Sequence, residues 1–250
     1  MLLKAEGIVI RSRDYGEANK IMTLYTKEYG KLSLMARGAK KPKSRLSSIA
    51  QLFTHGQYLF FRGSPRTMGT LSQGEILDSF RELRQDLVKT AYAAYMAELV
   101  DKLIDEEEVP PALFPLLTTV FQHLNEGKDP EILARLFELK ILVMAGYKPE
   151  VDRCVVCHGT EGSFSFSVQE GGYLCQRCQH ADPQALHLQT NTLKLMRFLY
   201  HFDPFRLGRI NVKPETKKEL CQAMWLFMDQ HTPLRLKSRK FLEQMGRFWN

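Results

Sequence analysis

Two pairs of cysteines restrict the fold of this chain more than any other feature of its sequence. Two residues separate Cys154 from Cys157 and Cys175 from Cys178, and 17 residues lie between the pairs. Two thiolates with this spacing can bind one ion from a tight turn, and two such turns complete a tetrahedral site. Because four thiolate ligands leave no position for water or substrate, we expect one structural zinc ion rather than a catalytic one.

The segment between the two pairs predicts a small β-hairpin. Residues 164–168 alternate phenylalanine or valine with serine, which is the two-residue period of a strand. The glycines at 171–172 predict a turn, and a second short strand then leads into Cys175. We therefore expect residues 151–182 to form a zinc ribbon, whose small core requires the metal to fold.

Other interpretations of the cysteines stay open. The pairs could be redox-active dithiols or two disulfides, and His158 or His180 could replace a cysteine as a ligand. The chain begins Met-Leu-Leu-Lys-Ala-Glu, without a secretory signal, so we expect a reducing cytoplasm in which thiols bind metal. The fifth cysteine, Cys221, is expected to be a small buried apolar residue.

Positive charge is concentrated in the first third of the chain. The 250 residues carry a net charge of +7. Residues 1–80 contain 13 lysines and arginines against 6 acidic residues, whereas residues 81–250 contain 22 of each kind. Such a local excess is typical of a module that binds a polyanion. Because no apolar run approaches the length of about 18 residues that spans a bilayer, we expect no membrane association.

Short β-rich runs separated by turns occupy the first 80 residues. Four or five strands in a segment of this length predict a small barrel, and we expect a five-stranded OB-fold over residues 1–79. The runs are residues 8–10, 21–25, 31–36, 57–61 and, interrupted by Gly69 and Gly74, residues 67–76.

The period of the apolar residues changes at Phe80. From there to Leu103 they recur every three or four positions, which predicts one amphipathic helix. We expect an α+β protein in which an N-terminal OB-fold barrel precedes an all-α domain over residues 80–250, with the zinc ribbon inserted in that domain. The further helices are expected at residues 112–124, 131–145, 191–202, 214–230 and 238–248.

The densest basic stretch, residues 37–45, lies between two predicted strands. It has five positive side chains and no carboxylate, and Gly38 and Pro42 keep it out of a helix or a central strand. OB-folds bind single-stranded nucleic acid with a cationic track and aromatic stacking residues. We therefore expect the nucleic-acid contacts at Arg37, Lys40, Lys41, Lys43 and Arg45, extended by Arg11, Arg13 and Lys20.

Six aromatic residues of the same region could stack on bases. Because a small barrel needs large apolar side chains inside it, most of the six are expected in its core. They are Tyr15, Tyr29, Phe53, Tyr58, Phe60 and Phe61.

The sequence contains no recognisable catalytic motif, so we expect a binding protein and not an enzyme. The segment from Gly38 to Ser44 resembles a phosphate loop only loosely, since no glycine directly precedes its Lys-Ser pair. The acidic run at residues 105–108 cannot converge on one metal from a single helix. Two further classes stay open: an RNA-binding component of translation or RNA processing, and a zinc-dependent or thiol-redox enzyme.

Four segments resemble the bacterial recombination mediator family RecO. They are Glu6–Arg11 (EGIVIR), Arg37–Arg45 (RGAKKPKSR), Gly171–Cys175 (GGYLC) and Leu236–Leu242 (LKSRKFL). The resemblance covers the full chain and agrees in domain order, since these proteins have an OB-like barrel followed by a helical domain. Many members of the family, though not all, have the zinc cysteines.

This resemblance implies a role in the RecF pathway of DNA repair, in the cytoplasm and at the nucleoid. RecO-like proteins bind single- and double-stranded DNA, anneal complementary strands, and work with RecR to load RecA onto gaps coated with SSB. The barrel is then expected to contact DNA and RecR. The helical domain is expected to bind the acidic, hydrophobic C-terminal tail of SSB.

Overall fold

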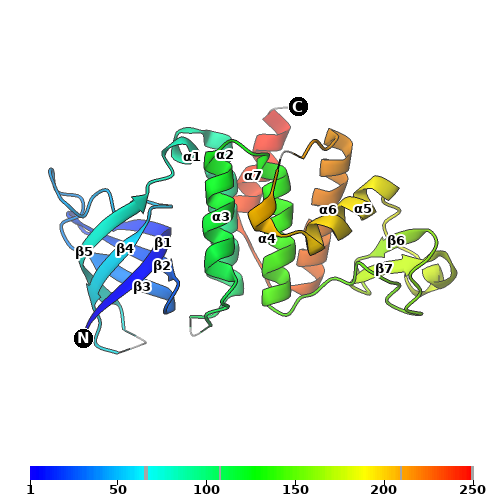
Figure 1. Cartoon of the computed structure of the whole chain (residues 1–250), viewed down its shortest axis with the longest axis horizontal. Helices are drawn as coiled ribbons and strands as arrows, with labels where there is room; N and C mark the ends of the chain where they lie inside the picture. The colour runs from blue at the N-terminus through cyan, green and yellow to red at the C-terminus, as the bar shows by residue number, and fades with distance from the viewer. Residues whose placement is uncertain (65–66, 107, 209, 249–250) are drawn as a thin grey trace. The chain divides into compact units, whose positions relative to one another are not determined.

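The computed structural model describes residues 1–64, 67–106, 108–208 and 210–248, and Figure 1 shows its ribbon. The chain divides into two compact units. The first unit comprises residues 1–127 and 236–250, and the second comprises residues 128–235. The first contains a β-barrel, the helices that directly follow it and the last helix of the chain, and the second contains the four cysteines.

Five strands of the first unit form a closed β-barrel. Antiparallel pairing joins the first strand to the second and fourth, the second to the third, and the fourth to the fifth, while the third and fifth strands pair in parallel. This order, β1-β2-β3-β5-β4, confirms the predicted OB-fold. The strands are β1 (Leu2–Tyr15), β2 (Asn19–Thr26), β3 (Gly30–Ala36), β4 (His55–Phe61) and β5 (Gly69–Asp78).

Strand β1 is far longer than the run of residues 8–10 that the sequence indicates, because it serves two neighbours. Its first half pairs with β4, from Leu2 opposite Phe61 onwards, and its second half pairs with β2 as far as Tyr15 opposite Asn19. The register shifts between Val9 and Arg11. A bulge of this kind bends a strand, and the polar residues beyond it form the exposed end of a hairpin.

Strand β5 contains the two glycines that the sequence suggests as interruptions. A Cβ atom on Gly69 would lie 2.7 Å from a methyl group of Leu34, and one on Gly74 would overlap the side chain of Ile49. Both glycines therefore lie where the strand passes close to the barrel core, which is a recognised use of glycine in a strand. The expected strand is continuous through them.

The predicted helix from Phe80 to Leu103 is wrong in one respect, because the structure breaks it into α1 (Arg81–Gln85) and α2 (Leu87–Leu103). Asp86 adopts an extended backbone, and its carboxylate accepts a hydrogen bond from the N–H of Lys89 at 3.0 Å. An aspartate in this role caps a new helix. Leu87, which fits the predicted apolar face, is 59% exposed at the break.

Two more helices complete the first unit, α3 (Leu113–Asn125) and α7 (Lys237–Phe248). Helix α7 is joined to α2 by Glu98, whose carboxylate accepts hydrogen bonds from the backbone N–H groups of Lys237 (3.1 Å) and Ser238 (2.8 Å). The side chain thus satisfies unpaired donors at the start of a helix far away in sequence.

The second unit combines helices with a two-stranded hairpin, which lies between α4 and α5 in chain order. Helix bounds agree with the predictions to within one or two residues, because proline and aspartate mark several starts clearly. None of the helices in the described part of the chain has the length and apolar composition needed to cross a membrane. The elements are α4 (Pro130–Met144), β6 (Phe164–Ser167), β7 (Gly172–Cys175), η1 (Gln176–Ala181), α5 (Thr190–His201), η2 (Pro204–Arg206) and α6 (Pro214–His231).

Candidate metal centre and nucleic-acid interface

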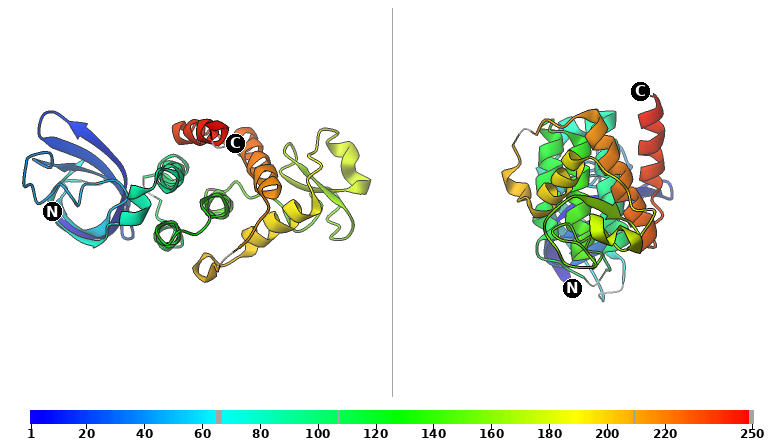
Figure 2. Two further views of the ribbon diagram at one scale, coloured as in Figure 1. Left: turned by 90° about the horizontal axis from the view of Figure 1, so that it is seen from above. Right: turned by 90° about the vertical axis from the view of Figure 1, so that its right-hand side faces the viewer.

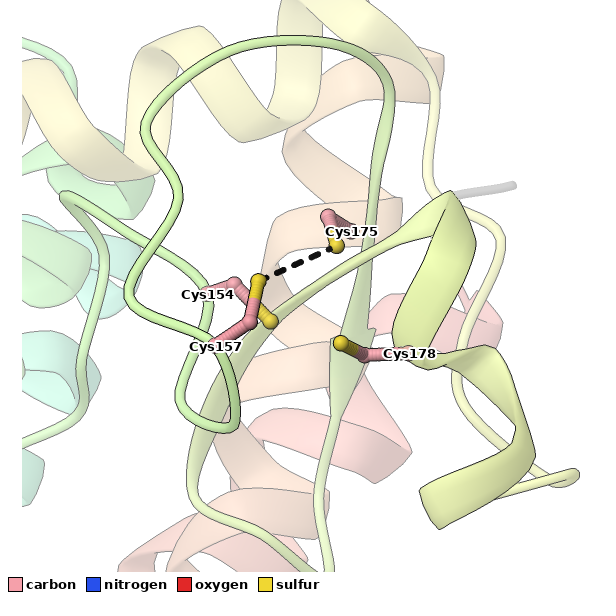
Figure 3. Close-up of side chains that lie close together, drawn as sticks. All are labelled: Cys154, Cys157, Cys175 and Cys178. Carbon is pink, nitrogen blue, oxygen red and sulfur yellow. Dashed lines mark hydrogen bonds between the residues drawn. The ribbon is translucent and has the colours of Figure 1, made fainter.

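The four cysteines of the two pairs meet at one end of the β6–β7 hairpin (Figure 3). Cys154 and Cys157 lie on the turn that precedes β6, Cys175 ends β7, and Cys178 lies on η1. All four sulfur atoms are within 4.8 Å of one another, and the Cys157 and Cys175 sulfurs are 3.6 Å apart. The sequence-predicted ligand set is therefore brought together as a cluster that could hold a metal ion.

Backbone hydrogen bonds shape the first cysteine turn. The N–H of Cys154 donates to the carbonyl of Gly159, and the N–H of His158 donates to the carbonyl of Cys154, both at 2.9 Å. His158 has a φ of 59°, which closes the turn tightly. The turn is joined to the hairpin by the N–H of Val155, which donates to the carbonyl of Tyr173 at 2.8 Å.

The hairpin is also anchored by aromatic side chains. Phe166 is fully buried, with its ring 6.2 Å from that of Tyr173 and 6.1 Å from that of Phe227 on α6. The Tyr173 hydroxyl donates to the carbonyl of Leu193 at 2.6 Å. The ring of His231 contacts the carbonyl of Val168 at 2.6 Å. These contacts stabilise the hairpin independently of any metal.

The geometry of the sulfurs fits a tetrahedral cation. Zinc–sulfur bonds of about 2.3 Å place ligand sulfurs about 3.8 Å apart, close to the separation of Cys157 and Cys175, whereas a disulfide needs about 2.05 Å. Burial disfavours the Cys154 thiolate, but backbone N–H groups in both cysteine turns donate to its sulfur and lower its pKa to about 6. Burial, together with the neighbouring sulfurs, raises the pKa of Cys178 to about 12. A bound cation would lower the pKa of all four sulfurs, including Cys178, because metal binding favours the thiolate form.

The other candidate ligands lie outside the cluster. His158 and His180 are both exposed, and neither belongs to a metal-binding group in the described part of the chain. The ring of His180 instead contacts the carbonyl of Arg177 at 3.1 Å. Cys221, which the sequence suggests as buried, has intermediate exposure on α6, and desolvation raises its pKa to about 11.

The basic loop is a series of turns attached to the end of the β1–β2 hairpin. The N–H of Gly38, with φ 69°, donates to the Asn19 side chain, and the N–H of Lys40 donates to the carbonyl of Ala18, both at 2.9 Å. Ala39 is buried against the barrel core. Residues further along the same segment, Ile49 among them, also enter this core. The loop is therefore irregular, as expected, but fixed in position.

A carboxylate from outside this segment pairs with one of its charges. No carboxylate occurs within the segment, yet the Lys40 ammonium lies 2.8 Å from the carboxylate of Asp14, which β1 supplies. That hydrogen bond and the positive charges of Lys40 and Lys20 lower the pKa of Asp14. Among the other predicted contact residues Lys20 is half-buried and the rest are exposed, namely Arg11, Arg13, Arg37, Lys41, Lys43 and Arg45.

The barrel aromatics divide into two groups. The expectation that most of the six are in the core is half right, because three of them are at most 1% exposed, namely Phe53, Tyr58 and Phe60. Tyr29 is 38% exposed, and its ring meets that of Phe60 edge to face at 6.4 Å. Tyr15 and Phe61 are 52% and 55% exposed.

An OB-fold barrel with a fixed cationic loop and a four-cysteine module defines a class of nucleic-acid-binding protein with a metal-binding insertion. Comparison with known proteins specifies the family. The family model "Recombination protein O N terminal" matches residues 1–80, and "Recombination protein O C terminal" matches residues 84–240. The chain belongs to the RecO family of DNA repair proteins.

Individual relatives agree along almost their whole length. The chain is 50% identical to the DNA repair protein RecO of Halalkalibacterium halodurans over 98% of this chain and 96% of the relative. It is 49% and 46% identical to the proteins of the same name from Bacillus pumilus and Bacillus subtilis, in both cases over 98% of this chain and 95% of the relative. The family assignment supports a role in DNA repair and recombination with DNA binding, and gives no support to the RNA-binding alternative.

Proposed function

We propose that this protein is a non-enzymatic recombination mediator. It binds and anneals single-stranded DNA and, with RecR, helps to load RecA onto SSB-coated DNA during the repair of gaps and double-strand breaks. It also binds double-stranded DNA, and it acts in the cytoplasm at the nucleoid. The observation that carries this proposal is the exposed cationic loop at residues 37–45, fixed at the end of an OB-fold barrel in a chain of the RecO family.

The proposal assigns a task to each part of the chain. Residues 1–79, the barrel, bind DNA through the loop cations together with Arg11, Arg13 and Lys20, and also contact RecR. Residues 80–250 bind the acidic, hydrophobic C-terminal tail of SSB. Within that segment, residues 151–182 hold one structural Zn²⁺ on Cys154, Cys157, Cys175 and Cys178. The ion would fix the cysteine turns and leave no open coordination position for chemistry.

The partner assignments can be tested by capture. Purified full-length protein should retain RecR and a peptide with the sequence of the SSB tail, and should retain neither RecA nor a scrambled peptide. Failure to retain RecR and the peptide would contradict the mediator role, even if DNA binding persisted.

The DNA site can be tested by reversing charge on the loop. Lys41→Glu with Lys43→Glu is the appropriate variant, because both side chains are exposed and form no ion pair in the described part of the chain, whereas Lys40 pairs with Asp14. The variant should bind single-stranded DNA and anneal complementary strands more weakly than wild type. This loss should be far larger at low salt than at high salt, since screening weakens both attraction and repulsion.

A matched control separates this effect from a general change of charge. Lys194→Glu with Lys218→Glu makes the same charge reversal at two exposed positions of the second unit. We expect this control to bind DNA like wild type and both variants to melt within a few degrees of it, because exposed substitutions usually change stability by less than about 0.5 kcal/mol. If the control lost DNA binding and the loop variant kept it, the DNA site would be in the helical part of the chain.

A further inference from the structure

The hairpin end beside the cationic loop carries an exposed aromatic ring. Tyr15, the last residue of β1, is 52% exposed, whereas Tyr25, Tyr58 and Phe60 on the barrel strands are fully buried. A tyrosine that leaves half of its surface in water contributes little free energy of burial to the barrel core. Its ring instead offers a flat apolar face to a ligand.

The ring and the cationic loop belong to one fixed structure. Tyr15 pairs with Asn19 across the hairpin, and the Asn19 side chain holds the N–H of Gly38 at 2.9 Å. The carbonyl of Ala18 accepts from the N–H of Lys40, also at 2.9 Å. In Figure 2 the dark-blue β1–β2 hairpin and the lighter-blue segment after β3 lie at the same end of the barrel. Tyr15, the turn at residues 18–19 and the cationic loop are therefore positioned relative to one another before any ligand binds.

Strand alternation places a cation on the same face as the ring. The Ser12 hydroxyl donates to the carbonyl of Ala50 at 2.9 Å, and Asp14 pairs with Lys40, so these alternate side chains face the segment after β3. Arg13 and Tyr15 consequently share the other face of β1, and both are exposed. An arginine beside a stacking ring matches the alternation of phosphate and base along a single strand.

We infer that Tyr15 is a base-stacking residue of the single-strand site. An unpaired base lies on the tyrosine ring, while Arg13, on the same face of β1, contacts a flanking phosphate. The inference rests on the proposed function and adds to it, since phosphate contacts alone hold single and double strands similarly, whereas stacking requires an unpaired base. A base paired inside a duplex has no free face for the ring.

Phe61 provides an internal control of similar exposure. It is 55% exposed on β4 and pairs with Leu2, at the opposite end of β1 from Tyr15. Leu2 is itself 51% exposed. Cations also lie near Phe61, namely Arg62 and the N-terminal ammonium group that donates to its carbonyl at 2.9 Å, but none of the loop cations and none of Arg11, Arg13 and Lys20 is on this part of the barrel's pairing with β1.

The test compares Tyr15→Ala, Tyr15→Phe and Phe61→Ala on two ligands of equal length and charge, an oligothymidylate and its abasic phosphodiester counterpart. Tyr15→Ala should bind the oligothymidylate about tenfold more weakly, as expected for one lost stacking contact, and should bind the abasic strand like wild type. Tyr15→Phe should match wild type on both, because the ring and not the hydroxyl makes the contact. Phe61→Ala should also match wild type on both.

The outcomes separate this inference from the proposed function. Wild-type affinity of Tyr15→Ala for the oligothymidylate, with weak binding by the Lys41→Glu, Lys43→Glu variant, would overturn the stacking role and leave the DNA-binding role standing. An equal loss on both ligands would also overturn it, since a residue that only shapes the loop would affect phosphate contacts. If wild-type protein bound neither ligand, the proposed function would fail and the inference with it.

Discussion

At the scale of single residues, the metal assignment depends on four sulfur atoms. Cys175→Ser replaces a thiolate with a hydroxyl that stays protonated and is a poor ligand for zinc. We expect wild-type protein to contain about one zinc per chain and the variant to lose most of it. Elemental analysis of the purified proteins gives the stoichiometry, and Cys221→Ser, which lies outside the cluster, should keep the metal.

Loss of zinc should destabilise the β6–β7 hairpin and leave the barrel unchanged. Structural zinc contributes on the order of ten kcal/mol to the folding of the segment that binds it, but Phe166 and Tyr173 also hold this hairpin to the helices. Hydrogen exchange should therefore accelerate in β6 and β7 of Cys175→Ser and stay unchanged in the barrel. Wild-type protein without zinc, carrying two disulfides under reducing conditions, would contradict the assignment.

Single residues also show where sequence reasoning reaches its limit. The cysteine spacing predicts the cluster correctly, because a short spacing restricts geometry almost by itself. The pairing of Lys40 with Asp14 could not be predicted in the same way, because the carboxylate comes from another strand and the contact depends on how the loop folds back onto the hairpin.

At the scale of elements, strand β5 tolerates only glycine at position 74, since any Cβ there would overlap the Ile49 side chain. Gly74→Val should destabilise the protein by about 1–3 kcal/mol, as overpacking does in a dense core. Urea unfolding followed by circular dichroism measures the change. Gly208→Ala is the control, because no atom lies within 4 Å of a Cβ at that position, and a drop in stability as large as that of Gly74→Val would mean that Ile49 is not the cause.

The elements that sequence patterns predict well are those with strong local signals. The strands of the barrel and the helices that begin with proline or a capping aspartate have such signals. The break at Asp86 was missed, because an aspartate within an apolar period of three and four also fits the polar face of one helix. The length of β1 was missed, since its polar second half lacks the apolar alternation of a strand with one buried face.

At the scale of the whole molecule, sequence predicts the order of the parts, whereas the compact units depend on contacts between segments. The barrel belongs to one unit with α1–α3 and α7. Periodicity reports local structure only. The hydrogen bonds from Glu98 to the start of α7 connect residues that are far apart in the chain, and no local pattern records them.

The salt dependence of DNA binding tests the charge distribution of the molecule as a whole. A single strand held through about five phosphate contacts should lose affinity with a slope of about −3.5 when log affinity is plotted against log salt. Lys41→Glu with Lys43→Glu removes two of these contacts, so its slope should be shallower by about 1.4. Fluorescence anisotropy titrations across a range of salt concentrations measure both slopes.

The same titrations test whether affinity depends on the base sequence of the strand. Phosphates carry no base information, so strands of different sequence should bind with similar affinity at each salt concentration. Stacking on Tyr15 should not disturb this similarity much, because every base has a flat face. Tyr15→Ala should therefore lower affinity at every salt concentration without changing the slope, whereas the loop variant changes the slope itself. A wild-type slope near zero, or strong preference for one sequence, would contradict a general single-strand mediator whose excess positive charge lies on its barrel.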